Sequence, residues 1–277
     1  FIEADVRDAT ELLRIGRAKG PFDAIVHQAS IINSRIDAEE IDVDVGVNVS
    51  GTLNMLRVLK ETGARRFLYG SSVAVYGRPN KLPASEETTP ILPIASYGIA
   101  KVAAEHYVRY YCEPLPGVSY ANLRYANLYG PRQDLFGEVG VIRYFVESIL
   151  TKGKITVFGD GEQVRDYLYI SDCVNATLVA LDSTQDLTVN VGSGQPTTVR
   201  DVVDTLNKIS GLEFDVLSGP PRHGEIGRFW CDTSAASEAL GWQPEVGLAD
   251  GILRTLVWAR SLMATIAETG IKCPDPR

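Results

Sequence analysis

Cysteine and histidine are scarce in this chain, and neither is spaced for metal binding. Among 277 residues there are four cysteines and three histidines. The cysteines stand far apart, at Cys112, Cys173, Cys231 and Cys273, and form no C-x-x-C pair. Structural zinc sites and disulfide frameworks place such residues at short, repeated spacings. We therefore expect no metal site and no disulfide bonds, as is usual in a reducing cytoplasm.

The chain also lacks long apolar runs and an excess of positive charge. No run approaches the ~18 apolar residues that a membrane-spanning helix needs, and no signal-peptide pattern opens the chain. Its 27 Lys and Arg against 35 Asp and Glu give a net charge of −8. Nucleic acids and anionic membranes bind basic surfaces. We therefore expect a cytoplasmic globular protein with neither kind of partner, and the length suggests one or two domains.

The most informative stretch runs from a predicted strand to a predicted helix. The strand is Arg66–Tyr69, so Ser71 and Ser72 follow at its carboxyl end, where open α/β sheets bind their ligands. Tyr97 opens a helical segment, and Lys101 follows four residues later on the same face. A lone Y-x-x-x-K pattern is weak support, because the chain has 12 tyrosines. An ammonium group beside a phenol favours the phenolate, so the pair is a plausible tuned base.

Several motifs along the chain strengthen this interpretation. Ser72 stands four residues before the tyrosine of the V-Y-G at Val75–Gly77. Residues 123–133 read L-R-Y-A-N-L-Y-G-P-R-Q, and residues 158–167 read F-G-D-G-E-Q-V-R-D-Y. These motifs resemble the extended short-chain dehydrogenase/reductase superfamily, in its NAD-dependent epimerase/dehydratase family of the UDP-glucose (UDP-galactose) 4-epimerase type. The resemblance spans almost the whole chain.

The resemblance implies an α/β fold with a doubly wound parallel sheet of the Rossmann type and a smaller α+β substrate lobe. The family's first strands and glycine-rich turn are absent from this chain, which contains no G-x-x-G-x-x-G and starts at the family's third strand. We expect residues 1–129 with about 166–195 to form the dinucleotide-binding domain. Residues 130–165 with about 196–277 are expected to form the lobe that binds a nucleotide sugar. Whether the chain as given binds a cofactor stays open.

The resemblance also implies roles for individual residues. The implied catalytic residues are Ser72, Tyr97 and Lys101. The implied contacts with NAD are Asp5, Val6, Gln28, Ala29, Ser30, Asn48, Ser71, Tyr97, Lys101 and Tyr125. The implied contacts with the UDP-sugar substrate are Ser72, Asn127, Val141, Thr156, Phe158, Arg165, Arg222, Glu225 and Phe229. The two arginines suit a diphosphate, because a guanidinium group binds phosphate oxygens with two parallel hydrogen bonds.

The implied reaction is NAD-dependent epimerisation at C4 of a UDP-sugar through a transient 4-keto intermediate. Val73 and Ala74 stand where the related dehydratases carry an acid pair, so dehydration is disfavoured. The large Phe229 is expected to exclude an N-acetyl group, which favours UDP-glucose and UDP-galactose. A UDP-uronic acid is the alternative substrate, with Arg143 as its candidate cation.

Two further alternatives concern the state of the protein. The missing glycine-rich turn leaves open a truncated binding remnant that has no catalytic activity. The resemblance also implies a homodimer, formed by the predicted helices Val43–Thr62 and Tyr97–Tyr111.

Overall fold

The computed structural model describes residues 1–32, 41–133, 140–222 and 224–269. They form two compact units. Unit 1 comprises Phe1–Tyr125, Asn175–Val191 and Asp232–Trp242. Unit 2 comprises Ala126–Val174, Gly192–Cys231 and the described residues from Gln243 onward. The predicted assignment of these parts to cofactor and substrate stays a prediction.

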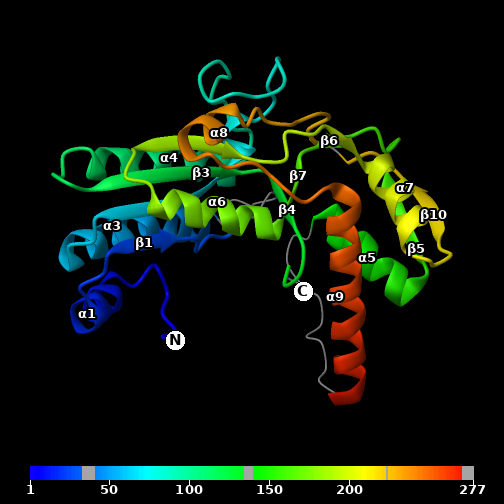
Figure 1. The fold of residues 1–277 in the computed structure, drawn as a ribbon, viewed down its shortest axis with the longest axis horizontal. Helices are drawn as coiled ribbons and strands as arrows, with labels where there is room; N and C mark the ends of the chain where they lie inside the picture. The colour runs from blue at the N-terminus through cyan, green and yellow to red at the C-terminus, as the bar shows by residue number, and fades with distance from the viewer. Residues whose placement is uncertain (33–40, 134–139, 223, 270–277) are drawn as a thin grey trace. The chain divides into compact units, whose positions relative to one another are not determined.

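Unit 1 is built on a parallel sheet in the order β1-β2-β3-β8, of which Figure 1 labels β1 and β3. Its strands are β1 (Ala24–His27), β2 (Arg66–Ser72), β3 (Ser119–Tyr125) and β8 (Leu187–Val191). Each neighbouring pair is parallel. β2 is buried over nearly its whole length, as expected for a strand covered on both faces. The predicted parallel α/β architecture is confirmed, and the strands' carboxyl ends meet at one edge.

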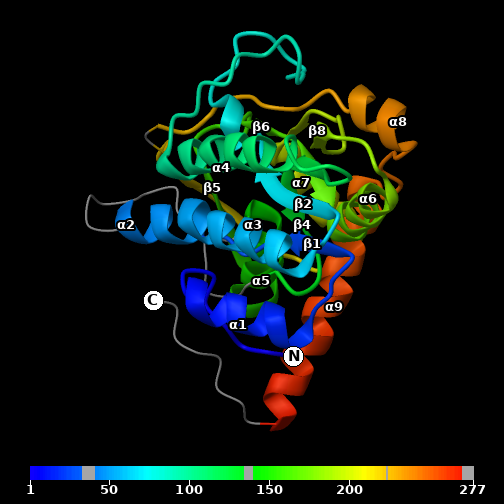
Figure 2. The same cartoon turned by 90° about the vertical axis from the view of Figure 1, so that its left-hand side faces the viewer.

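Helices α1 (Ala9–Lys19), α3 (Gly51–Thr62) and α4 (Ser96–Cys112) lie in a row, with α3 in contact with both others (Figure 2). Asp8 caps α1 by accepting the backbone N–H of Glu11. The core between helices and sheet joins apolar residues of α3, α4, β2 and other elements, among them Leu56, Leu59, Ala104, Val108, Phe67 and Tyr69. Unit 1 also contains α8 (Ser234–Leu240).

The predicted helix Val43–Thr62 is helical throughout but not uniform. It consists of α2 (Ile41–Asp44), a π-helical turn η2 (Val45–Ser50) and α3. A β-carbon on Gly51 would lie 2.8 Å from a Val6 methyl group, so glycine permits close packing here. Short π turns inside helices often occur at functional sites.

Unit 2 combines three pairs of short strands with three helices. The parallel pairs are β5 (Lys154–Phe158) with β10 (Asp215–Gly219), and β4 (Asn127–Tyr129) with β7 (Tyr167–Tyr169). The antiparallel pair is β6 (Val164–Arg165) with β9 (Thr197–Thr198). Helices α5 (Val141–Lys152), α7 (Val199–Ile209) and α9 (Leu248–Thr269) share a core that includes Phe145, Leu206 and Ile252.

Helix α6 (Ile170–Asp182) begins at Ile170 and has Asp172 in its first turn. Asp172 accepts the backbone N–H groups of Glu245 and Val246. No helix in the described part of the chain is both long and apolar enough to cross a membrane.

Candidate active site

Ser72 is held at the carboxyl end of β2 by the turn that follows it. Its hydroxyl accepts the N–H of Ala74 at 3.2 Å and so caps the short helix η3 (Val73–Tyr76). The chain then reverses at Gly77, whose φ is 62°. A β-carbon there would lie 2.0 Å from the carbonyl oxygen of Leu92, so the turn requires glycine.

The first turns of α4 bring Tyr97 and Lys101 to the same place. The Lys101 ammonium lies 5.5 Å from the centre of the Tyr97 ring. The hydroxyls of Ser72 and Ser30 lie near the Tyr97 hydroxyl, and their interaction with it works to lower the Tyr97 pKa. A β-carbon on Gly98 would lie 2.7 Å from the carbonyl oxygen of Ala74, so glycine lets α4 approach this turn. The structure thus brings together the three residues that the sequence singled out as catalytic.

Lys101 is a buried cation, with 2% of its surface exposed. Its Nζ donates to the Gly70 carbonyl oxygen at 2.6 Å and lies 4.7 Å from the centre of the Tyr69 ring. Burial lowers the pKa of Lys101 to about 8, and the carboxylates of Glu105 and Asp44 oppose this shift. Lys101 is therefore largely charged at neutral pH.

The expected lowering of the Tyr97 pKa is wrong for the protein in this form. Burial raises the pKa of Tyr97 above its ordinary value, although the hydroxyls of Ser72 and Ser30 oppose this. The Lys101 ammonium donates to the Gly70 carbonyl oxygen and lies over the Tyr69 and Tyr97 rings. It does not cancel the rise that burial causes in the Tyr97 pKa. Tyr97 is therefore a protonated phenol at neutral pH here.

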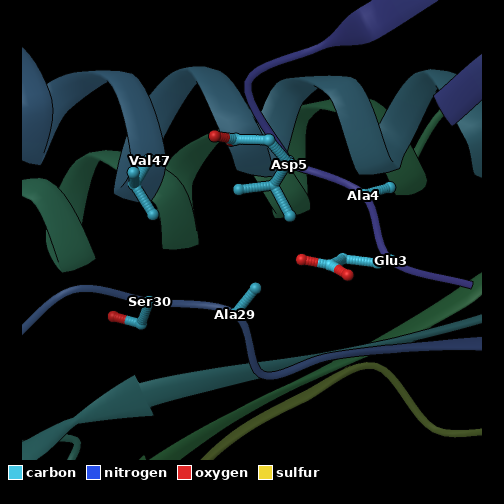
Figure 3. Close-up of a pocket in the computed structure, with 7 residues that line it drawn as sticks. Glu3, Ala4, Asp5, Ala29, Ser30 and Val47 are labelled. Carbon is cyan, nitrogen blue, oxygen red and sulfur yellow. The ribbon is translucent and has the colours of Figure 1, made fainter. Parts of the chain in front are cut away.

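Four of the residues expected to contact NAD line one hollow of about 660 Å³ (Figure 3). They are Asp5, Val6, Ala29 and Ser30, joined by Glu3, Ala4 and Val47. The Arg7 guanidinium holds the Asp5 carboxylate at 2.6 Å and lowers the pKa of Asp5 to about 2. Because short side chains line one wall, the backbone at Ala29 and Ser30 is open to a ligand.

Asn48 contacts the rim of this hollow from within the protein. Its Oδ1 accepts the Ser30 hydroxyl at 2.7 Å and the Ile31 N–H at 3.1 Å. Its Nδ2 donates to the Ile31 carbonyl oxygen and to the Asp44 carboxylate. The side chain is 1% exposed, so it orients the Ser30 segment from inside the fold.

The remaining residues expected at the cofactor side divide into two groups. Gln28 donates to the Tyr125 hydroxyl at 2.9 Å, at the carboxyl ends of β1 and β3. Ser71, by contrast, is 2% exposed, and its hydroxyl donates to the Glu105 carboxylate. Ser71 therefore presents little surface to a ligand.

Unit 2 contains its own cluster of predicted substrate residues. Arg165 Nη2 donates to Glu225 Oε1 at 2.9 Å. The Arg222 guanidinium lies 4.4 Å from the centre of the Phe158 ring. Gln163 connects the two pairs, because its amide donates to the Phe158 carbonyl oxygen and lies 3.5 Å from Glu225. The two arginines predicted to bind a diphosphate thus lie in one neighbourhood.

The other predicted substrate residues are spread through unit 2. Thr156 lies on β5 two residues before Phe158, and an exposed Asn127 starts β4. Val141 begins α5 and packs against the core. Phe229 is 4% exposed, so it presents little surface to a ligand in this form.

Sequence reasoning missed two buried carboxylates beside Lys101. Glu105 is 7% exposed and lies one turn after Lys101 on α4, a spacing that could have been noticed. Asp44 is 1% exposed and lies four residues before Asn48. The sequence does not indicate that Asp44 is buried, because Asp42, the same residue type two positions earlier, is exposed.

A parallel sheet that gathers Ser72, Tyr97 and Lys101 at its carboxyl edge is the arrangement of a short-chain dehydrogenase/reductase with a Rossmann-like fold. A model of the NAD dependent epimerase/dehydratase family matches residues 1–192, and the chain belongs to this family.

Known relatives are similar over nearly the whole chain. A UDP-glucose 4-epimerase of Mycolicibacterium smegmatis is 35% identical over 265 residues, which cover 94% of this chain and 83% of the relative. The crystal structure of a UDP-glucose 4-epimerase of Thermotoga maritima with UDP-glucose is 35% identical, with a TM-score of 0.89, covering 95% of this chain and 85% of that one. A Thermus thermophilus UDP-glucose 4-epimerase in complex with NAD is 33% identical, with a TM-score of 0.83, covering 93% and 83%.

Proposed function

We propose that this chain catalyses the NAD-dependent epimerisation of a UDP-sugar at C4, with UDP-glucose and UDP-galactose as the favoured pair. The observation that carries the proposal is the meeting of Ser72, Tyr97 and Lys101 beside the hollow that Ser30 helps to line. The relatives named above support it, since all three are UDP-glucose 4-epimerases. The complete catalytic cluster counts against a remnant without activity.

The residues present fit NAD. The hollow is open and bounded by the short side chains of Ala29 and Ser30, and Lys101 offers a buried positive charge near it. When bound, NAD supplies the nicotinamide carbon that accepts and returns a hydride. Val6, Gln28 and Tyr125 would complete the contacts with it.

The chain's own residues handle the proton. As the phenolate, Tyr97 takes the proton from the sugar's 4-hydroxyl and later returns it, so a 4-keto sugar forms transiently. The phenol must first lose its own proton, because burial raises its pKa and keeps it protonated at neutral pH. Ser72 donates a hydrogen bond to the same oxygen. Lys101 would bind the cofactor ribose, and its ammonium lies 5.5 Å from the centre of the Tyr97 ring. The hydroxyls of Ser72 and Ser30 oppose the rise that burial causes in the Tyr97 pKa.

The cluster in unit 2 would bind the nucleotide part of the substrate. Arg165 and Arg222 would hold the diphosphate, and Glu225 the ribose. The ion pair between Arg165 and Glu225 pre-orients the guanidinium. Asn127, Val141, Thr156 and Phe158 would complete this binding surface.

The choice of sugar rests on Phe229 and Arg143. A phenyl ring at position 229 would leave little room for an N-acetyl group at C2, which favours UDP-glucose and UDP-galactose. Arg143 was the candidate cation for a uronic acid, but it is 1% exposed and lies 5.7 Å from the Trp258 ring. This burial supports an uncharged C6 group on the sugar.

A homodimer in the cytoplasm is part of the same proposal. Exposed apolar side chains gather on the outer side of α4, where Ile99 is 58%, Tyr107 41% and Tyr110 73% exposed. Val43 and Val45 continue such a surface on α2 and η2, which contact α4. A second copy would remove this apolar area from water. Light scattering of the wild type and of Tyr110→Lys tests this, with a monomeric variant expected.

The deciding experiment is an interconversion assay with NAD and a panel of UDP-sugars. We expect UDP-glucose and UDP-galactose to interconvert fastest, ahead of the N-acetylated sugars and UDP-glucuronic acid. No conversion of any UDP-sugar by NAD-supplied protein that binds UDP would contradict the proposed activity. Faster conversion of UDP-glucuronic acid would move the proposal to the alternative substrate.

A further inference from the structure

Asp44 is a buried carboxylate that the proposed mechanism does not use. It is 1% exposed and lies where α2 passes into the π turn η2. One of its oxygens accepts the Asn48 amide and the other accepts the Ser96 hydroxyl. Both oxygens therefore act as acceptors, and both donors come from segments that form the catalytic cluster.

Each of these hydrogen bonds leads to Tyr97 by a different route. Ser96 is the first residue of α4 and precedes Tyr97 directly. Asn48 accepts the Ser30 hydroxyl at 2.7 Å, and the Ser30 hydroxyl lies near enough to the Tyr97 hydroxyl to act on its pKa. Asp44 thus ties the backbone that carries Tyr97 to a group that lies near its reacting oxygen.

The negative charge of Asp44 is balanced locally. It lies close enough to Lys101 to favour the charged ammonium and so raise its pKa against the effect of burial. The amino-terminal end of α4 adds partial positive charge from its unpaired N–H groups. A buried carboxylate is costly unless other groups stabilise it; Asp44 is hydrogen-bonded through both oxygens and has the positive charge of Lys101 nearby.

We propose that Asp44 is a positioning residue for Tyr97, because it fixes the first turn of α4 against the Asn48–Ser30 pair beside the buried Lys101. This inference rests on the proposed function. An amide at position 44 would present two N–H groups in place of one acceptor oxygen, so at least one of the two contacts would be lost. A misplacement of a catalytic group by about 1 Å can cost around 100-fold in rate.

Several charged or titratable groups surround Tyr97 among the described residues. Lys101 and Glu105 lie on α4, Tyr69 on β2, Asp44 on α2 and His27 on β1. Of these, Asp44 raises the pKa of Tyr97, as does burial, the larger cause. Removing the Asp44 charge is therefore expected to shift the Tyr97 titration to lower pH.

The test compares Asp44→Asn with Asp42→Asn, a matched control whose side chain is exposed on the same helical turn. We expect Asp44→Asn to lower kcat for UDP-galactose by about tenfold or more, with KM and UDP affinity unchanged. Asp42→Asn is expected to match the wild type. An unchanged kcat in Asp44→Asn, or a loss of kcat that an equal loss of UDP affinity accompanies, would overturn the inference.

Two further measurements keep the result decisive. If Asp44→Asn does not fold, Ser96→Ala removes one of the contacts and Ser96→Thr restores its hydroxyl; we expect kcat to fall in the first and recover in the second. NMR of isotope-labelled tyrosine, with Tyr97 assigned from Tyr97→Phe, reports the Tyr97 titration without turnover. If the wild type converts no UDP-sugar, only the proposed function is refuted. If the Tyr97 titration in Asp44→Asn is the same as in the wild type, the role of Asp44 is refuted.

Discussion

Glu105 and Arg124 form a two-pronged ion pair in the interior of unit 1. Arg124 Nε donates to Oε1 of Glu105 at 2.9 Å and Nη2 donates to Oε2 at 2.7 Å. Their side chains are 9% and 8% exposed, and the pair connects α4 to β3. Ser71 donates to the same carboxylate, and Arg124 donates to the Tyr76 hydroxyl. Helix α4 is thus attached to the sheet by charge as well as by apolar packing.

Breaking the Glu105–Arg124 ion pair is expected to lower the free energy of unfolding by a large amount. Glu105→Gln leaves the Arg124 guanidinium buried without its counter-charge, which typically costs about 3–5 kcal/mol. Glu113→Gln is the control, since Glu113 pairs with Arg109 in solvent, where such pairs contribute about 0–1 kcal/mol. Chemical denaturation of both variants measures the difference. Equal free energies of unfolding for the two variants would show that the buried pair stabilises the fold no more than the exposed pair does.

Tyr97→Phe is expected to abolish most of the epimerase activity. Only the transferable proton is lost, and general acid–base groups typically contribute about 10²–10⁴-fold to a rate. UDP binding is expected to persist, because the predicted nucleotide contacts lie elsewhere. Tyr107→Phe, on the exposed side of α4, is the control. Near-normal turnover of Tyr97→Phe in a steady-state assay would refute the assignment of the base.

Arg165→Ala and Arg222→Ala are each expected to weaken UDP binding. Loss of one charge-assisted hydrogen bond costs about 1.5–3 kcal/mol. Isothermal titration with UDP measures the affinity, and Arg200→Ala is a matched control because Arg200 pairs with Glu162 in solvent. If both variants bind UDP as the wild type does, the substrate cluster has been misplaced.

Phe229→Ser is expected to admit N-acetylated sugars. The wild type should prefer UDP-galactose over UDP-N-acetylgalactosamine in direct competition, and the serine variant should lose that preference. Because Phe229 is 4% exposed, the variant also removes packing, so its melting temperature must be measured alongside. A wild type indifferent to the acetamido group, or a stable variant with no gain on the acetylated sugar, would exclude this selection.

His27 predicts a pH dependence of stability. Burial lowers the pKa of His27 from 6.5 to about 4, and Lys101 adds to the shift. The unfolded chain therefore binds an extra proton between these values, and the free energy of unfolding falls as the pH drops from about 6.5 to about 4. Urea denaturation across this range should show a shallower slope in His27→Gln than in the wild type. His106→Gln, at an exposed position, should leave the slope unchanged.

Much of the fold was predictable because residues at the ends of helices and strands indicate where these elements begin and end. Gly20-Pro21 marks the end of the helix Ala9–Lys19, and short stretches with consecutive or alternating apolar residues mark the strands Ala24–His27 and Leu187–Val191. The meeting of Tyr97 and Lys101 was predictable because they share a helix face. The partners of buried charges were not, because Glu105 meets Arg124 and Asp44 meets Ser96 only after distant segments pack. The π turn inside Val43–Thr62 was missed for the same reason.

The order of the strands has a consequence for how the protein emerges from the ribosome. β8 pairs with β3 along the sheet, yet 61 residues lie between the end of β3 at Tyr125 and the start of β8 at Leu187. At a synthesis rate of about 5–20 residues per second, roughly 3–12 s pass between the completion of β3 and the start of β8. Over that time its unpaired N–H and C=O groups can bind another strand. Nascent chains stalled between residues 125 and 187 are thus the stage most open to aggregation and to capture by chaperones.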